Sequence, residues 1–168
     1  MKPLIEKLPL SNNQSFVART YRTPHFEVPW HQHIEVECIL FTEGEGVAFV
    51  GNHVGEFKTG DVFFLGSNLP HCFQKATKDM ITSAVVIQFN SNFWGDSFLN
   101  LPENQNIREL LQTASGGIKL SPEIGNKITP IIKSLEYDKD AARIFNLYQL
   151  LWIISSNPLE QPLSTQEV

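Results

Sequence analysis

The character of the chain changes near residue 95, and this change limits the fold more than any other feature. Before it, short runs of β-branched and aromatic residues alternate with glycine-containing turns such as 43–46 and 60–61, which is typical of an all-β sandwich or barrel. After Asn90, apolar residues recur every three or four positions, as they do in helices. The predicted strands are 16–22, 37–42, 47–50, 54–57, 62–65 and 81–89. We therefore predict a mainly β fold, with a β-barrel over residues 16–92 and a helical layer over residues 93–157.

The helical part contains clear start and stop signals. The order serine, proline, glutamate at 121–123 predicts an N-cap, a first-turn proline and an acidic residue near the positive end of a helix. Gly125 and Pro130 weaken this helix, so we expect a kink or break near Thr129. The last helix is predicted to run from residue 138 to about residue 155.

The last predicted helix holds more apolar residues than one face against a small barrel requires. Leu147, Leu150 and Ile153 widen its apolar stripe. Packing of the whole stripe on the barrel is one interpretation. The other is a subunit interface, because a surface helix that also meets a partner has such a stripe. We expect a homodimer formed mainly through this helix.

Composition and charge predict one domain that binds neither nucleic acid nor membrane directly. The 168 residues suit a single hydrophobic core, and 42% apolar against 18% charged residues excludes a disordered or coiled-coil chain. The 13 Lys and Arg against 18 Asp and Glu give a net charge of -5, which disfavours phosphate-rich partners. No apolar run approaches the roughly 18 residues of a membrane span, and the N-terminus does not resemble a signal peptide. We expect a cytoplasmic location.

Three of the five histidines lie in two short segments and offer the ligands of one site. In an extended strand His31 and His33 point to the same face, and together with Glu37 and His71 they would suit a divalent ion of zinc, iron, nickel or manganese. If residues 31–37 formed one straight strand, His31 and Glu37 would lie about 20 Å apart. A shared site therefore requires the chain to bend between His33 and Glu37.

These residues also form a recognisable motif. The spacing His-x-His-x3-Glu-x6-Gly, from His31 to Gly44, resembles the first signature of the cupin superfamily. The segment 60–71, which begins Gly-Asp and ends Pro-His, resembles the second signature, although it lacks the usual proline-x-glycine turn. The resemblance implies a cupin-like β-barrel, also called a double-stranded β-helix or jelly roll, in which a chain reversal brings the histidines and the glutamate together.

Together with Pro-Trp-His-Gln-His at 29–33, the motifs are similar to the N-terminal sensor domain of arabinose-regulator (AraC-type) transcription factors. This resemblance implies a pocket for a small-molecule effector, a homodimer formed through the trailing helices, and an N-terminal arm at 1–15 that folds over the barrel mouth. It also implies that 158–168 is a linker to a DNA-binding helix-turn-helix domain. The chain has no such pattern after Pro158, so we expect DNA to be bound only by that missing domain.

Two functions from different classes follow. The first is a non-enzymatic sensing and dimerisation domain for transcription regulation. The alternative is a metal-dependent cupin enzyme, an isomerase or dioxygenase, that uses a bound ion as a Lewis acid.

Six residues are candidates for ligand binding, and the roles of four of them stay open. These four form a hydrogen-bonded lining for the hydroxyl groups of an effector, the ligands of a divalent metal ion, or a purely structural cluster. The other two are aromatic residues, which either belong to the core or stack on a sugar, so a sugar is one candidate effector. The six residues are His31, His33, Glu37, His71, Trp30 and Phe73.

Overall fold

The computed structural model describes residues 2–8, 14–23 and 29–165. Part of the expected N-terminal arm (residues 1 and 9–13) and the last three residues of the expected linker therefore lie outside the described residues.

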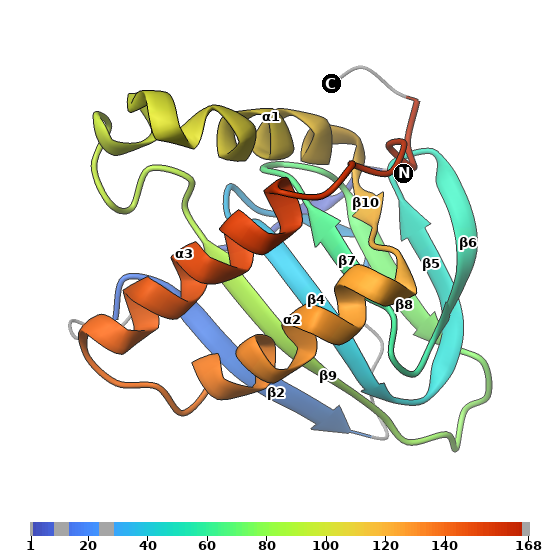
Figure 1. Ribbon diagram of the computed structural model, residues 1–168. Helices are drawn as coiled ribbons and strands as arrows, with labels where there is room; N and C mark the ends of the chain where they lie inside the picture. The colour runs from blue at the N-terminus through green and yellow to red at the C-terminus, as the bar shows by residue number, and fades with distance from the viewer. Residues whose placement is uncertain (1, 9–13, 24–28, 166–168) are drawn as a thin grey trace.

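Two five-stranded sheets face each other and form the predicted barrel (Figure 1). One sheet has the strand order β1-β3-β8-β5-β6, and the other has the order β10-β7-β4-β9-β2. The strands are β1 (Leu4–Ile5), β2 (Val17–Thr23), β3 (His31–Gln32), β4 (Val36–Glu43), β5 (Glu45–Val50), β6 (His53–Lys58), β7 (Val62–Leu65), β8 (His71–Lys75), β9 (Thr82–Phe89) and β10 (Ile118–Lys119).

The six strands predicted from the sequence are confirmed, with ends that move by no more than two residues. Four further strands, β1, β3, β8 and β10, were not expected. Three of them have only two residues, which is too short to show an alternating pattern. They form because distant segments supply hydrogen-bond partners, as β7 does for β10.

Side chains of the strands alternate between the inside of the barrel and the outer face that meets the helices. On β4, Ile39 and Phe41 belong to the interior cluster, whereas Cys38 and Leu40 belong to the cluster under the helices. Aromatic rings fill much of the interior, and the ring centroids of Phe41 and Phe57 lie 4.1 Å apart. The sheet that contains β4, β7 and β9 is covered on both faces and is therefore apolar on both sides. The unbroken apolar run of β7 predicts this.

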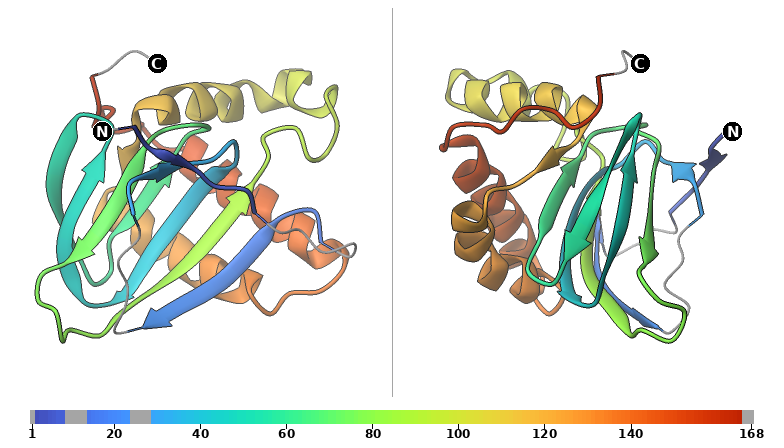
Figure 2. Two further views of the ribbon diagram at one scale, coloured as in Figure 1. Left: turned by 180° about the vertical axis from the view of Figure 1, so that it is seen from behind. Right: turned by 90° about the vertical axis from the view of Figure 1, so that its right-hand side faces the viewer.

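The helices cover the outer face of the sheet that contains β4 and β9 (Figure 2). The α-helices are α1 (Gln105–Thr113), α2 (Pro122–Leu135) and α3 (Ala141–Ser155), and the 3-10 turns are η1 (Phe98–Asn100), η2 (Pro102–Asn104) and η3 (Ala114–Gly116). Among the residues described, no helix is long and apolar enough to cross a membrane.

The start of α2 is confirmed, but the expected break inside it is not observed. The Ser121 hydroxyl accepts a hydrogen bond from the Ile124 amide, as an N-cap does. The helix then continues through Pro130 to Leu135. Three fully buried residues on one face, Ile128, Ile132 and Leu135, hold it against the core. This burial outweighs the hydrogen bond that the proline removes.

The sequence-based description of α3 needs two corrections. The helix begins at Ala141 rather than at residue 138, because Asp140 has a φ of 55°, outside the helical region. Leu147 and Leu150 are fully buried in the core and Ile153 is partly buried, so they do not form an exposed extension of the stripe. The large apolar side chains of α3 that are exposed are Ile144, Phe145 and Trp152.

The described part of the C-terminal segment is docked rather than free. The amides of Leu163 and Ser164 donate to the carbonyls of Gly117 and Gly116, both at 2.8 Å. The Asn52 side chain bonds to Ser164 and Thr165. The sequence predicts a linker here, and its polar, aperiodic residues give no sign of these contacts.

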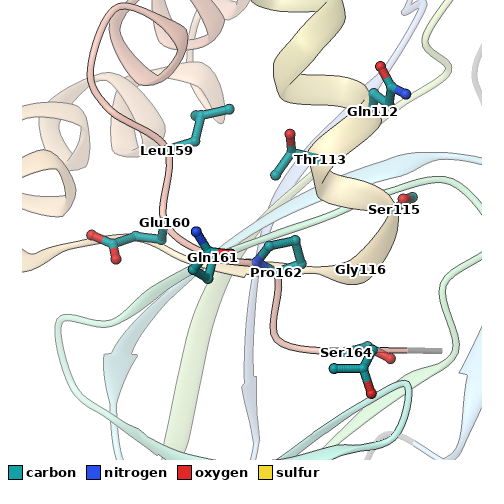
Figure 3. A pocket seen from close by; sticks show the side chains of 10 residues that line it. Gln112, Thr113, Ser115, Gly116, Leu159, Glu160, Gln161, Pro162 and Ser164 are labelled. Atoms are coloured by element: carbon teal, nitrogen blue, oxygen red, sulfur yellow. The ribbon is translucent and has the colours of Figure 1, made fainter. Parts of the chain in front are cut away.

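An open groove of about 760 Å³ lies between the docked segment and the end of α1 (Figure 3). Its lining includes Gln112, Thr113, Gln161 and Pro162, and it shares no residue with the predicted histidine site.

Docking of this segment depends on a glycine in the β5–β6 turn. Gly51 has a φ of +55°, and a Cβ atom there would lie 2.2 Å from the Ser164 Oγ. We expect Gly51→Ala to lower the free energy of unfolding by more than Gly60→Ala. Gly60 also has a positive φ, but a Cβ there has no neighbour within 4 Å in the part of the chain that the structure describes, so Gly60→Ala costs only the backbone strain of about 1–2 kcal/mol. Urea unfolding of the two variants measures the difference, and equal losses would mean that the docked segment adds no stability.

Candidate functional site

Four residues of the predicted site meet inside one end of the barrel. His31 lies on β3 and pairs across the sheet with His71, the first residue of β8. The chain bends at residues 34–35, between β3 and β4, so that Glu37 lies beside His33 and His71. Because of this bend, the separation of about 20 Å between His31 and Glu37 that a straight strand would impose does not arise. One ring nitrogen of each of the three histidines lies within 4.8 Å of the other two.

Backbone carbonyls orient all three imidazoles. The Nδ1 atoms of His31, His33 and His71 lie 2.8, 2.9 and 2.7 Å from the carbonyl oxygens of Pro29, Glu35 and Leu69. Each carbonyl can only accept, so each Nδ1 holds a hydrogen and donates. In the neutral ring the Nε2 atom is then left with a lone pair, which is the usual arrangement of a histidine that binds a metal.

Glu37 is the buried carboxylate at the centre of the group. Its Oε1 accepts a hydrogen bond from Gln88 Nε2 at 2.8 Å and lies 3.2 Å from His33 Nε2. Its Oε2 lies 3.5 Å from His71 Nε2. Burial alone would raise the pKa of Glu37, but the nearby His71 and the hydrogen bond from His33 outweigh it and hold this pKa well below its ordinary value.

The histidines have different proton affinities because their surroundings differ. Burial, assisted by the neighbouring His71, lowers the pKa of His31. Burial also acts on His33, but its hydrogen bond and charge interaction with Glu37 raise the pKa of His33 overall. A proton shared by His33 and Glu37 is therefore held on the His33 ring, and the Glu37 carboxylate is ionised.

In this site, hydrogen-bond acceptors of the histidines face hydrogen-bond acceptors of Glu37. A cation between them would bind both. With neutral rings, the lone pairs of His33 and His71 point at the carboxylate oxygens of Glu37. Among the described residues, the buried Nε2 of His71 has no hydrogen-bond partner. A proton or a metal ion between these atoms would remove the conflict. Three imidazoles and one carboxylate are ligands that zinc, iron, nickel and manganese accept, so these residues fit a divalent transition-metal ion.

The two aromatic candidates lie in different environments. Phe73 is 1% exposed and packs among Phe41, Phe57 and Phe63, with its ring centroid 6.2 Å from that of His71. It therefore lies directly beneath the site, as part of the aromatic core. Trp30 is partly exposed and directly precedes His31.

Sequence reasoning missed two polar residues of the site. Gln88 lies opposite Glu37 in the β4–β9 ladder, and only knowledge of this pairing would have revealed it. Glu6 lies just after β1, and its Oε2 is 3.3 Å from His31 Nε2. No spacing or motif connects residue 6 to the histidines, because the contact arises from a two-residue strand pairing.

Comparison with known proteins shows which fold this architecture has. Residues 20–87 match the family model of the cupin domain. The chain has a cupin fold. No curated protein sequence matches it significantly. The cupin barrel and its helices together are similar to ToxT from Vibrio cholerae O395, bound to (E)-4-(8-methylnaphthalen-1-yl)but-3-enoic acid. This match has a TM-score of 0.56 at 13% identity and covers 85% of this chain and 56% of ToxT.

A second ToxT structure, from Vibrio cholerae strain SCE256 and bound to an unsaturated fatty acid, gives a TM-score of 0.55 at 14% identity. It covers 88% of this chain and 55% of ToxT. The cupin chain thus spans little more than half the length of ToxT, and the shared part includes the helices as well as the barrel.

The Glu37 carboxylate sets the proton affinity of its histidine partner. We expect Glu37→Gln to lower the pKa of His33 in metal-free protein, because the amide cannot stabilise the imidazolium as a carboxylate does. Histidine NMR titration in the presence of a chelator measures this change. Glu56→Gln, which removes an exposed carboxylate on β6, is the matched control and should leave the titration of His33 as it is. An unchanged His33 titration in Glu37→Gln would contradict the assigned pair.

Proposed function

We propose that this chain is the small-molecule-sensing and dimerisation domain of an AraC-type transcription regulator and that it is not an enzyme. The observation that supports this most is the joining of a convergent, buried polar site to a helical layer. The site lies inside the barrel, and the helices pack on the outside of the same sheet that holds Glu37. Occupancy of the site can therefore act on the helices through one shared sheet.

The likeness to ToxT supports a small-molecule effector. The two ToxT structures are bound to a naphthyl butenoic acid and to an unsaturated fatty acid, which are both carboxylic acids with an apolar body. The present chain would accept an effector at the histidine end of the barrel, with a carboxylate or a sugar as the polar group. Its net charge of -5 disfavours direct DNA binding by this chain, and in the proposal a separate helix-turn-helix domain binds DNA.

The proposed effector site includes a divalent metal ion. His31, His33, Glu37 and His71 would hold it, with the imidazole orientation already set by the three backbone carbonyls. A bound ion would supply positive charge that attracts and polarises an oxygen atom of the effector. Gln88 would keep the Glu37 carboxylate in place through its hydrogen bond.

A metal-dependent cupin enzyme, an isomerase or dioxygenase, is the second candidate. The observation that favours it is the buried group of three histidines, with Glu37 beside His33 and His71, which also suits catalysis. The two candidates differ in what happens to the bound molecule, because a sensor releases it unchanged.

Effector binding tests the proposed function. We expect the metal-loaded protein to gain thermal stability with one class in a panel of fatty acids, aromatic acids and sugars, and we expect mass spectrometry to recover that compound unchanged. At 100 times the dissociation constant, binding adds about 2.7 kcal/mol to the stability. His71→Gln should abolish the gain, whereas His53→Gln, on β6 outside the site, should keep it. Consumption of the compound would support the enzyme instead.

The proposed dimer uses the exposed apolar side chains of α3. Phe145 and Trp152 are 73% and 58% exposed, and Ile144 lies beside them. Such a group of large apolar side chains on one helix is typical of an interface with another protein surface.

We expect the unmodified chain to be a dimer at micromolar concentration and the double variant Phe145→Glu with Trp152→Glu to be a folded monomer, because two charges would be buried in the interface. Light scattering coupled to size exclusion measures both masses. Lys133→Glu, an exposed charge change on α2, is the control and should remain dimeric. A monomeric unmodified chain would contradict the proposal.

A further inference from the structure

We propose that Glu6, which follows the N-terminal strand β1, is a further ligand of the cation site. This inference rests on the cation in the proposed function and adds a fifth side chain to its four ligands. The contact that points to it is the 3.3 Å separation between Glu6 Oε2 and His31 Nε2.

Backbone pairing positions Glu6 at the site. Strand β1 runs parallel to β3, with Leu4 opposite His31. The Leu4 amide donates to the Trp30 carbonyl at 3.1 Å, and the Glu6 amide donates to the Gln32 carbonyl at 2.8 Å. Figure 2 shows this N-terminal strand lying along the edge of the barrel. The segment thus fixes the backbone of residue 6 beside the strand that holds the first histidine.

At Glu6, as at Glu37, a carboxylate oxygen faces the lone pair of a histidine nitrogen. The Nδ1 atom of His31 donates to the Pro29 carbonyl, so the neutral ring offers only a lone pair at Nε2. That lone pair faces the Glu6 carboxylate, which also can only accept. Each of the three imidazoles therefore has a carboxylate oxygen within 3.5 Å of its Nε2. A cation held by the three imidazoles would have these carboxylate oxygens beside it and would offset all three pairs, whereas a proton would satisfy one pair.

The charges of the group agree with a divalent ion. Three neutral imidazoles and two carboxylates have a net charge of about −2, which one divalent cation neutralises. A second carboxylate adds a hard oxygen ligand to the borderline imidazole nitrogens. This mixed set suits the first-row transition metals from manganese to zinc, and disfavours magnesium and calcium, which prefer oxygen ligands alone.

The two carboxylates differ in how firmly they are held. The Glu37 side chain is 5% exposed and bonded to Gln88, whereas the Glu6 side chain is 40% exposed. Strand β1 has only two residues, and the side chains of Leu4 and Ile5 are 63% and 74% exposed. Apolar burial therefore contributes little to the docking of this strand. A bond from Glu6 to the cation would add an anchor to the two backbone hydrogen bonds, so that cation binding and strand docking stabilise each other.

Cobalt(II) titration of chelator-treated protein tests the role of Glu6. We expect the unmodified chain to bind one equivalent of cobalt(II) and Glu6→Gln to bind it about tenfold or more weakly, with a changed visible absorption spectrum. Glu56→Gln, an exposed carboxylate far along β6, is the matched control and should bind cobalt(II) like the unmodified chain. Because Glu6 is partly exposed, Glu6→Gln should keep the unfolding temperature of the metal-free protein.

Hydrogen exchange supplies a second measurement. Cobalt(II) should slow exchange of the Leu4 and Glu6 amides in the unmodified chain, and should not do so in Glu6→Gln. Equal affinity, spectra and exchange in the two proteins would overturn the role of Glu6 while leaving the four-residue cation site in place. Absence of cobalt(II) binding to the unmodified chain would overturn both the cation site and the role of Glu6.

Discussion

The buried carboxylate of Glu37 is the constraint on which the site depends. A charged group in the wall of an apolar barrel is stable only when its oxygens are paired. Glu37 finds these partners in His33, His71 and Gln88, which come from three separate parts of the chain. Each partner in turn requires a particular backbone arrangement, because the imidazoles are oriented by carbonyls two residues away in the sequence. The bend after His33 and the register of β4 with β9 are both needed to satisfy one side chain.

The rest of the interior confines this polar group to one end of the barrel. Four phenylalanines, Phe41, Phe57, Phe63 and Phe73, pack with ring centroids 4.1–6.0 Å apart. They form a floor beneath His71 and exclude water from that side. Because the polar residues have a dry apolar layer below them, their charge interactions are stronger than they would be in water.

The outer face of the sheet connects the barrel with the helices through both apolar and charged contacts. Arg143 of α3 is buried and donates to the Phe16 carbonyl at 2.6 Å, with its guanidinium 4.3 Å from the Phe16 ring centroid.

At the other end, the Gly51 amide donates to the Pro70 carbonyl, next to His71, and Gly51 also contacts the docked C-terminal segment. The N-terminal strand β1 thus lies against β3, which holds His31, and the docked C-terminal segment contacts a turn that bonds to the residue before His71.

The sequence by itself determined the strand-rich first part, the helical second part, the N-cap at Ser121 and the four residues His31, His33, Glu37 and His71. These features depend on local periodicity, turn residues and a short motif, which neighbouring residues specify. Tertiary structure alone decided the bend at 34–35, the burial of Leu147 and Leu150, the docking of Ser164, and the addition of Gln88 and Glu6 to the site. Each of these depends on a partner far away in the chain, as Glu6 does on His31. Pairing and burial of this kind are set by the packed arrangement of elements, so no local pattern in the sequence records them.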